Sequence, residues 1–261
     1  MKLDQNWYTM AERGSFPSYA GHETFSILVE RFMSFVAGLT RPIGRVLRQA
    51  RIARIAFNSG LGDSANLLYG LVRSMKPETC VEIGSARGKS ACYIGIALAE
   101  NGSGRLYAID PHRPTKWNDA ESVDTFKIIQ ANLAALGLSE RVTIVRATSE
   151  EASRDWRHPI DLLFIDGDHS YDGVRHDWDL FVPYVKPFGI VVFHDTAWEI
   201  FNTRGQARPD MGVPRFVDEL REAGYPVLTI DRDYGVSLVQ PTPGGRPLRQ
   251  QAAAAKSIGS G

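Results

Sequence analysis

Cysteine is scarce in this sequence, which has only Cys80 and Cys92 among its 261 residues. The two lie outside any CxxC or zinc-binding spacing, and they are too few for a disulfide framework in a chain of this length. The cysteine content therefore excludes a disulfide-stapled scaffold, and we expect a protein of the reducing cytoplasm.

Net charge and long apolar runs are absent as well. The 30 Lys and Arg residues balance the 30 Asp and Glu residues. A neutral chain has no global field that attracts nucleic acid, so a charged partner would need a local patch. Arg31, Arg41 and Arg45 interrupt the one candidate apolar region, so we expect no transmembrane helix. The first residues lack the features of a signal peptide, and we expect no export.

The segment from Glu23 to Phe57 combines apolar positions with arginines spaced by three and four residues, which places them on one stripe of a helix. The stripe is either a solvated face of a helix that caps the core or a basic surface for an anionic substrate or membrane headgroups. The apolar positions favour a homodimer. The arginines of the stripe are Arg41, Arg45, Arg48, Arg51 and Arg54.

From residue 64 onward, short β-branched apolar runs alternate with amphipathic runs, which is typical of a parallel sheet covered by helices. Each apolar run is nearly continuous, as expected for strands buried on both faces. The predicted strands are Thr79–Ile83, Arg105–Ile109, Val142–Ala147, Asp161–Ile165 and Gly189–His194. The predicted helices between them are Ser90–Ala99, Val123–Leu136, a short one from Ser149, and Tyr171–Val185.

The last part of the pattern predicts a helix at Val213–Ala223 and a hairpin of Val227–Asp231 with Gly235–Val239. Together these elements predict a Rossmann-like α/β fold with a doubly wound, mostly parallel, seven-stranded sheet. We expect an N-terminal helical extension over residues 1–59, one domain over residues 60–240, and a disordered tail over residues 241–261.

The strongest local motif is the run Val81-Glu82-Ile83-Gly84-Ser85-Ala86-Arg87-Gly88-Lys89-Ser90, a strand that leads through a glycine turn into a helix. Glycines let the backbone approach a ligand, and the free amides of a helix start favour an anionic group such as a carboxylate. A dinucleotide site requires G-x-G-x-x-G, and a P-loop requires four residues between its glycines. This loop reads G-x-x-x-G and fits neither. It fits the acidic-x-Gly-x-x-x-Gly loop of class I methyltransferases.

Asp110 follows the second predicted strand and lies at the carboxyl end of the sheet, beside the same crevice. Its carboxylate can accept hydrogen bonds from both hydroxyls of a ribose. Such an acid also occurs in NAD enzymes, and a helix N-cap is its structural alternative.

Two more acids, Asp166 and Asp195, follow the fourth and fifth predicted strands, which we expect to be neighbours. Two adjacent carboxylates repel unless a cation lies between them, and their oxygens suit Mg²⁺ or a similar hard ion. His194 could add a nitrogen ligand, but alternation along the strand directs it to the opposite face.

His169 lies three residues past Asp166 in a glycine-containing loop and is our candidate for proton transfer. An imidazole titrates near neutral pH and can take the proton of an acceptor hydroxyl. The nearby acids, Asp168, Asp172, Asp177 and Asp179, are expected to supply a helix N-terminus and a solvated face. Loop residues that could line an acceptor pocket are His112, Arg113, Trp117, Tyr171 and Trp198.

The chain from about Gly60 to Val239 resembles the class I S-adenosylmethionine-dependent O-methyltransferases of the catechol and caffeoyl-CoA type, and the related macrolide-sugar and cephalosporin-hydroxylase-like enzymes. The matching residues are Leu61-Gly62-Asp63, the motif from Val81 to Gly84 with Gly88 and Ser90, Asp110, Ser149 and Asp166.

This resemblance implies specific roles for the matching residues. Ser90 and the loop amides, including those of Gly84, Ser85 and Gly88, would hold the methionine carboxylate, with Glu82 in the acidic position. Asp110 would hold the ribose, and Ser149 would lie beside adenine. A divalent ion would lie between Asp166 and Asp195, and His169 would stand where catechol enzymes have a lysine base. Thr196 replaces the expected asparagine ligand, and His194 precedes Asp195.

These features predict transfer of a methyl group from S-adenosylmethionine to a hydroxyl of a small molecule such as a sugar, a phenol or a polyketide. Two alternatives remain open. An NAD-dependent oxidoreductase could use the same sheet, because a fold does not decide function. A non-catalytic cofactor-binding accessory protein is the other, with the basic N-terminal helix docking on a partner.

Overall fold

The computed structural model describes residues 50–118, 121–197 and 208–241. These residues all belong to a compact unit that begins at Ala50. The expected extension over residues 1–59 falls almost entirely outside the described residues, as do Arg41, Arg45 and Arg48 of the stripe, Trp198, and all but the first residue of the expected tail.

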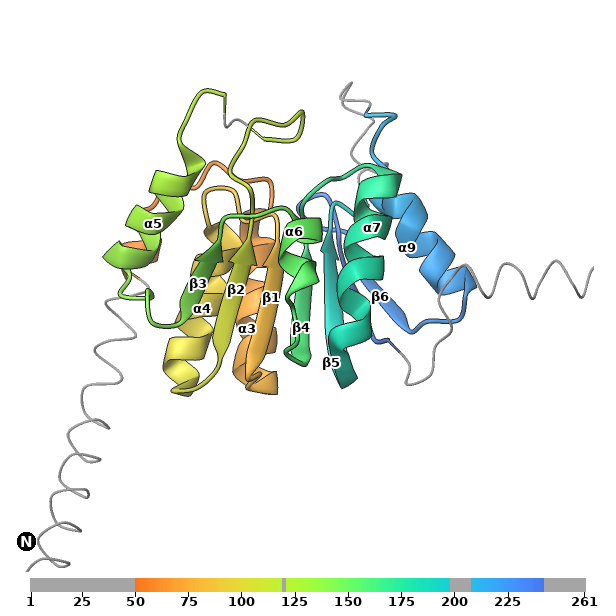
Figure 1. The fold of residues 1–261 in the computed structure, drawn as a ribbon, viewed down its shortest axis with the longest axis horizontal. Helices are drawn as coiled ribbons and strands as arrows, with labels where there is room; N and C mark the ends of the chain where they lie inside the picture. The colour runs from red at the N-terminus through yellow and green to blue at the C-terminus, as the bar shows by residue number, and fades with distance from the viewer. Residues whose placement is uncertain (1–49, 119–120, 198–207, 242–261) are drawn as a thin grey trace, which may run out of the picture. The chain divides into compact units, whose positions relative to one another are not determined.

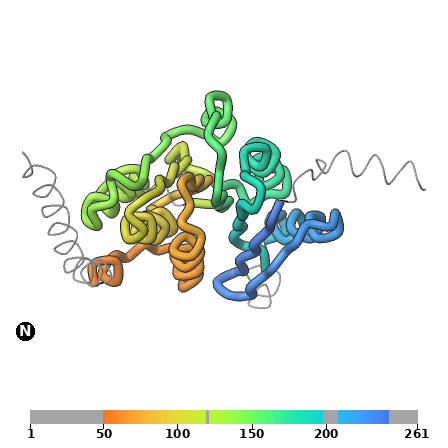
Figure 2. Tube along the Cα trace, turned by 90° about the horizontal axis from the view of Figure 1, so that it is seen from below, coloured from red at the N-terminus to blue at the C-terminus, as the bar shows by residue number. Residues whose placement is uncertain are grey.

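A seven-stranded sheet with helices on both faces forms the described unit (Figures 1 and 2). Its elements are η1 (Gly62–Ser64), α3 (Ala65–Met75), β1 (Thr79–Ile83), α4 (Lys89–Asn101), β2 (Arg105–Ile109), α5 (Thr125–Ala135), β3 (Val142–Val145), α6 (Ser149–Arg154), β4 (Ile160–Ile165), α7 (Tyr171–Phe181), η2 (Val182–Tyr184), β5 (Val185–His194), α9 (Val213–Glu222), β6 (Val227–Ile230) and β7 (Val236–Val239). Among the described helices, none is long and apolar enough to cross a membrane.

The strand order is β3-β2-β1-β4-β5-β7-β6, with β1 to β5 parallel and β7 antiparallel to both of its neighbours. The predicted fold class, a doubly wound and mostly parallel seven-stranded sheet, is therefore confirmed. The carboxyl ends of the parallel strands meet at the edge that is uppermost in Figure 1, where the loops after β1, β2, β4 and β5 converge.

Alternation along the strands divides the core into two apolar clusters, one on each face of the sheet. In β1, Cys80 packs with α3 and α4, whereas Val81 packs with α7 and α9 on the other face. Ile52 and Phe57 join the first cluster, although they precede the expected domain boundary. Burial of both faces explains why the strand sequences are nearly continuous in apolar residues.

Several element ends differ from the sequence-based expectation for local reasons. α7 ends at Phe181 rather than Val185, because Pro183 has no amide hydrogen to continue the helix. α5 begins at Thr125, after the Asp124 side chain caps it by accepting a hydrogen bond from the Lys127 amide. β5 begins at Val185, four residues before the expected start, with a register shift against β4.

Candidate active site

A cavity of about 840 Å³ lies at the carboxyl ends of the parallel strands. Loops after all five parallel strands line it, together with residues 57–61 and Tyr234 of the β6–β7 turn. The volume lies within the range of small-molecule and cofactor sites.

The glycine loop after β1 has a backbone that other residues would not tolerate. Gly84 has a φ of +84°, and a Cβ atom there would lie 2.2 Å from the carbonyl oxygen of Asp166. Gly88 has a φ of +81° and is the N-cap of α4, and a Cβ atom there would lie 2.5 Å from the Ile129 side chain. Both glycines are therefore required for the loop to pass between β4 and α5.

Asp110 fixes this loop from the tip of β2. Its Oδ2 accepts hydrogen bonds from the amides of Ser85 at 3.0 Å and Ala86 at 2.8 Å, and its Oδ1 accepts one from the His112 amide at 2.6 Å. The hydrogen bond from the His112 amide stabilises the turn after β2, so Asp110 has a structural role in addition to being a candidate ribose ligand. The Ser85 hydroxyl is buried, lines the cavity wall, and finds no hydrogen-bond partner within the described part of the chain.

Glu82 is fully buried at the end of β1 and accepts a hydrogen bond from the Ser90 hydroxyl at the start of α4. Burial raises the pKa of Glu82 to about 8, the Ser90 hydroxyl opposes this, and the charges of Asp166 and Asp110 add to it. Glu82 therefore keeps its proton at neutral pH in the folded chain.

Replacing Glu82 with Gln is expected to change the pH dependence of stability. Between about pH 4.5 and 8 the unfolded chain loses a proton that folded Glu82 retains, so this residue lowers the free energy of unfolding as pH rises. The neutral amide of Gln does not titrate, so the variant should not lose this stability, which amounts to about 1.4 kcal/mol for each unit of difference between the folded and unfolded pKa. Thermal melts of Glu82→Gln and the parent between pH 5 and 8 measure it, with Glu140→Gln in an exposed turn as the control. The same change in melting temperature with pH in E82Q and in the parent would contradict the raised pKa of Glu82.

Ser149 begins α6 and lines the cavity together with Asp177 of α7, whose charged form its hydroxyl favours. The expectation that Asp177 lies on a solvated face was wrong, because Asp177 is 4% exposed and lines the cavity. The periodicity of α7 contained the signal, since Asp177 is three residues after Val174 and four before Phe181, on the buried face.

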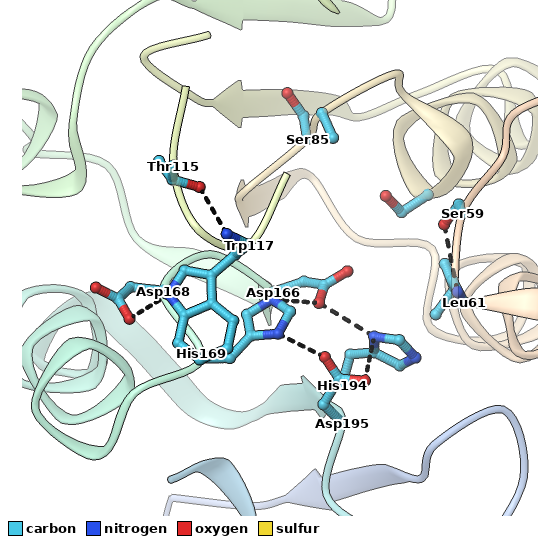
Figure 3. Close-up of polar contacts among 12 residues, drawn as sticks. Ser59, Leu61, Ser85, Thr115, Trp117, Asp166, Asp168, His169, His194 and Asp195 are labelled. Atoms are coloured by element: carbon cyan, nitrogen blue, oxygen red, sulfur yellow. Dashed lines mark hydrogen bonds and ion pairs between the residues drawn. The ribbon is translucent and has the colours of Figure 1, made fainter. Parts of the chain in front are cut away.

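The tips of β4 and β5 bring two carboxylates and two imidazoles together (Figure 3). His169 Nδ1 lies 2.7 Å from Asp195 Oδ2, and its Nε2 lies 3.6 Å from Asp166 Oδ1. His194 Nδ1 lies 3.1 Å from Asp166 Oδ1 and 3.4 Å from Asp195 Oδ1. The structure thus brings together all four side chains that the sequence singled out at these tips.

The expectation that His194 faces away from Asp195 was wrong. Asp195 lies just past the end of β5 with a φ of +60°, which breaks the alternation and returns its side chain to the His194 side. The other ring nitrogen of His194, Nε2, lies 2.8 Å from the carbonyl oxygen of Asp233. Sequence reasoning missed Asp233, whose carboxylate also accepts hydrogen bonds from the amide and hydroxyl of Ser64.

The negative charges of this cluster raise the pKa of both histidines. Burial lowers the pKa of His194, but the charges of Asp166 and Asp195 outweigh it and raise that pKa to about 9. Burial also opposes the charged form of His169, and its hydrogen bond to Asp195 with the charges of Asp195 and Asp166 raises the pKa of His169 above its usual value. The imidazoles can therefore neutralise the carboxylates, so two adjacent acids alone do not require a metal ion.

Trp117 covers His169, with the two rings stacked at 5.1 Å and 18° (Figure 3). Its Nε1 donates a hydrogen bond of 2.9 Å to Asp168, and the cations of Lys116 and Arg208 each lie 4.4 Å from its ring centroid. Of the other expected pocket residues, His112, Arg113 and Tyr171 do not line the cavity. His112 instead lies against Thr125 and Phe126.

Comparisons with known proteins agree with this geometry. Residues 81–196 match the model of a family described as a methyltransferase domain. An uncharacterized protein from Sinorhizobium fredii is 25% identical over 154 residues, which are 55% of this chain and 17% of that protein. An uncharacterized protein of Acanthamoeba polyphaga mimivirus is 53% identical over 36 residues, 14% of this chain and 16% of that protein. The matched region thus spans about a sixth of the length of these relatives.

Solved structures with similar folds include methyltransferases. They include a methyltransferase from Podospora anserina bound to S-adenosylhomocysteine (TM-score 0.57, 14% identity, 88% of this chain and 100% of that one). An O-methyltransferase from Bacillus cereus (0.55, 15%, 80% and 96%) and one of tomaymycin synthesis from Streptomyces achromogenes (0.53, 20%, 69% and 80%) are also similar. With the strand order, these similarities show that this chain has the fold of the S-adenosylmethionine-dependent class I methyltransferases.

Proposed function

We propose that this chain transfers the methyl group of S-adenosylmethionine to a hydroxyl of a small molecule. The observation that carries the proposal is one cavity that joins the glycine loop and Asp110 to the His169–Asp195 pair. The similarity to proteins described as O-methyltransferases supports oxygen as the methyl acceptor.

The cofactor would lie along the tips of β1 and β2. The amides at the start of α4, with the Ser85 hydroxyl, would hold the methionine carboxylate. The amides of Gly84, Ser85, Ala86 and Gly88 already donate hydrogen bonds within the chain. The carboxylate of Asp110 has lone pairs left for ribose hydroxyls after its three amide contacts. Ser149 would lie beside the adenine.

The reaction would be a direct displacement. The acceptor oxygen forms a bond to the methyl carbon, the bond from that carbon to sulfur breaks, and the products are a methyl ether and S-adenosylhomocysteine. His169 in its neutral form would accept the hydroxyl proton at Nε2 while Nδ1–H donates to Asp195, and the Asp195 carboxylate would stabilise the imidazolium that forms. Alignment of the reactants supplies much of the rate.

A divalent ion fits the donors at this site. Donor atoms of Asp166, His169 and Asp195 lie within 4.8 Å of one another. His194 Nδ1 also points between the two carboxylates, and its Nε2 is oriented by the Asp233 carbonyl, as is usual for metal-binding imidazoles. We propose that Asp166, Asp195 and His194 would hold the ion, which leaves His169 as the base. The bound ion would lower the pKa of the acceptor hydroxyl.

Removal of divalent ions is expected to lower methyl transfer at least about tenfold, as general metal assistance implies. Because one donor is an imidazole, Mn²⁺ or Co²⁺ should restore activity at lower concentration than Mg²⁺. The assay uses labelled cofactor after dialysis against a chelator, with each ion then added back. Full activity in excess chelator would show that the two imidazoles replace the ion.

Calorimetric titration tests the proposal directly. We expect S-adenosylhomocysteine to bind and NAD not to bind, because the loop lacks the dinucleotide spacing. A screen of hydroxylated acceptors with labelled cofactor would then identify the substrate. Binding of NAD instead would favour an oxidoreductase, and cofactor binding without turnover on any acceptor would favour an accessory protein.

A further inference from the structure

Asp177 is a carboxylate on the apolar face of a helix. It shares the buried face of α7 with Val174, Trp178 and Phe181. A buried charge is costly unless it is paired and hydrogen-bonded. Among the described residues, the Ser149 hydroxyl lies where it lowers the pKa of Asp177 and so favours the charged form. The proposed methyl transfer makes no use of this group.

The Asp177 side chain forms part of the cavity wall. A Cβ atom on Gly167, in the loop after β4, would lie 3.2 Å from Asp177 Oδ2. Asp177, Gly167 and Ser149 all line the cavity. Burial raises the pKa of Asp177 to about 6, the Ser149 hydroxyl and the charge of His176 oppose this, and the charge of Asp168 adds to it. The carboxylate thus faces the cavity with few hydrogen-bond donors among the described residues.

The sheet order indicates which part of the cofactor reaches this wall. The methyl group must approach His169 at the tips of β4 and β5, and the ribose must approach Asp110 at the tip of β2. The purine lies on the other side of the ribose from the sulfonium. It therefore falls toward the loop after β3, where Ser149 begins α6 and, like Asp177, lines the cavity.

We propose that Asp177, which lines the cavity with Ser149, accepts a hydrogen bond from the 6-amino group of the cofactor's adenine and so selects adenosyl over 6-oxopurine ligands. The inference rests on the proposed function. An ionised carboxylate only accepts hydrogen bonds, so it needs an N–H donor from the ligand. A 6-oxo base presents an oxygen at that position, which the carboxylate repels.

Binding of S-adenosylhomocysteine and S-inosylhomocysteine, measured by calorimetry, tests the inference. The parent chain is expected to prefer the adenosyl ligand by about 10-fold to 100-fold, the usual worth of a hydrogen bond to a charged group. In Asp177→Asn this preference should fall to within about threefold, because an amide can accept from an amino group or donate to a 6-oxo group.

Asp179→Asn is the matched control, on the same helix but 43% exposed and 3.9 Å from Arg175, and it should keep the parent preference. Equal binding of both ligands by the parent would overturn the inference, as would a parent-like preference in D177N. Failure of the parent to bind S-adenosylhomocysteine at all would instead refute the proposed function. The parent comparison needs no substitution, so the test holds even if D177N fails to fold.

Discussion

Alanine at position 169 is expected to lower turnover by about 10²- to 10⁴-fold, the usual loss when a general base is removed. The His169 imidazole lies 2.7 Å from Asp195 and 3.6 Å from Asp166, in the cavity where the proposed function has the acceptor hydroxyl lose its proton. Binding of S-adenosylhomocysteine should change little, because the glycine loop and Asp110 do not contact this ring. Single-turnover rates with labelled cofactor, and calorimetry on the same samples, measure the two effects.

His158→Ala is the control for the loss of an imidazole, since His158 is exposed and stacks on Tyr107 away from the cavity. It should keep parent turnover. Should His169→Ala also turn over at the parent rate once an acceptor is known, the imidazole has no part in proton transfer, and the cluster of carboxylates would have to take that role.

Alanine at position 84 is expected to abolish cofactor binding and to destabilise the chain by several kcal/mol. Two costs add at this position. The φ of +84° is strained for any residue with a Cβ atom, and that atom would lie 2.2 Å from the Asp166 carbonyl oxygen, a backbone atom that a side-chain rotation cannot clear. Relief of the clash must move the glycine loop away from β4, which opens the cofactor site. Thermal melts and titration with S-adenosylhomocysteine measure the two losses.

Gly137→Ala separates the two costs. Gly137 has a φ of +67° but nothing lies within 4 Å of its would-be Cβ atom, so this variant carries the backbone strain without the clash. It should lose only about 1 kcal/mol and bind the cofactor normally. Equal losses in the two variants would mean that backbone strain alone sets the effect, and that the close approach of the loop to β4 has no importance for binding.

Much of the fold was readable from the sequence because both faces of the parallel strands are buried. Short apolar runs such as Leu106 to Ile109, separated by amphipathic runs, are typical of strands in a covered sheet, and they predicted the five central strands. Ends of elements were less readable where one residue decides them, as Pro183 does for α7 and Asp124 does for α5.

The positions of site residues could be predicted from the sequence where those residues directly follow a strand. Asp110, Asp166 and Asp195 all lie at strand tips, so the strand order alone brought them to one edge. Their roles as cofactor or metal ligands stay predictions. The contact of Asp233 with His194 could not be predicted from the sequence, because the β6–β7 turn that carries Asp233 is 39 residues away along the chain. The orientation of His194 relative to Asp195 could not be predicted either, because it depends on the positive φ of Asp195. Period-two alternation does not apply beyond a strand end.

The position of β7 has a consequence for the order in which the molecule is made. β5 pairs with β4 on one side and with β7 on the other, and the turn before β7 carries Asp233, which contacts both Ser64 and His194. A nascent chain that has emerged only as far as β6 presents the apolar edge Val191-Val192-Phe193 unpaired, and such edges aggregate. Biosynthesis must therefore pass residue 239 before β5 is paired on both edges and the His194 imidazole meets the Asp233 carbonyl, so the part of the cavity built on β1 to β5 waits for β7.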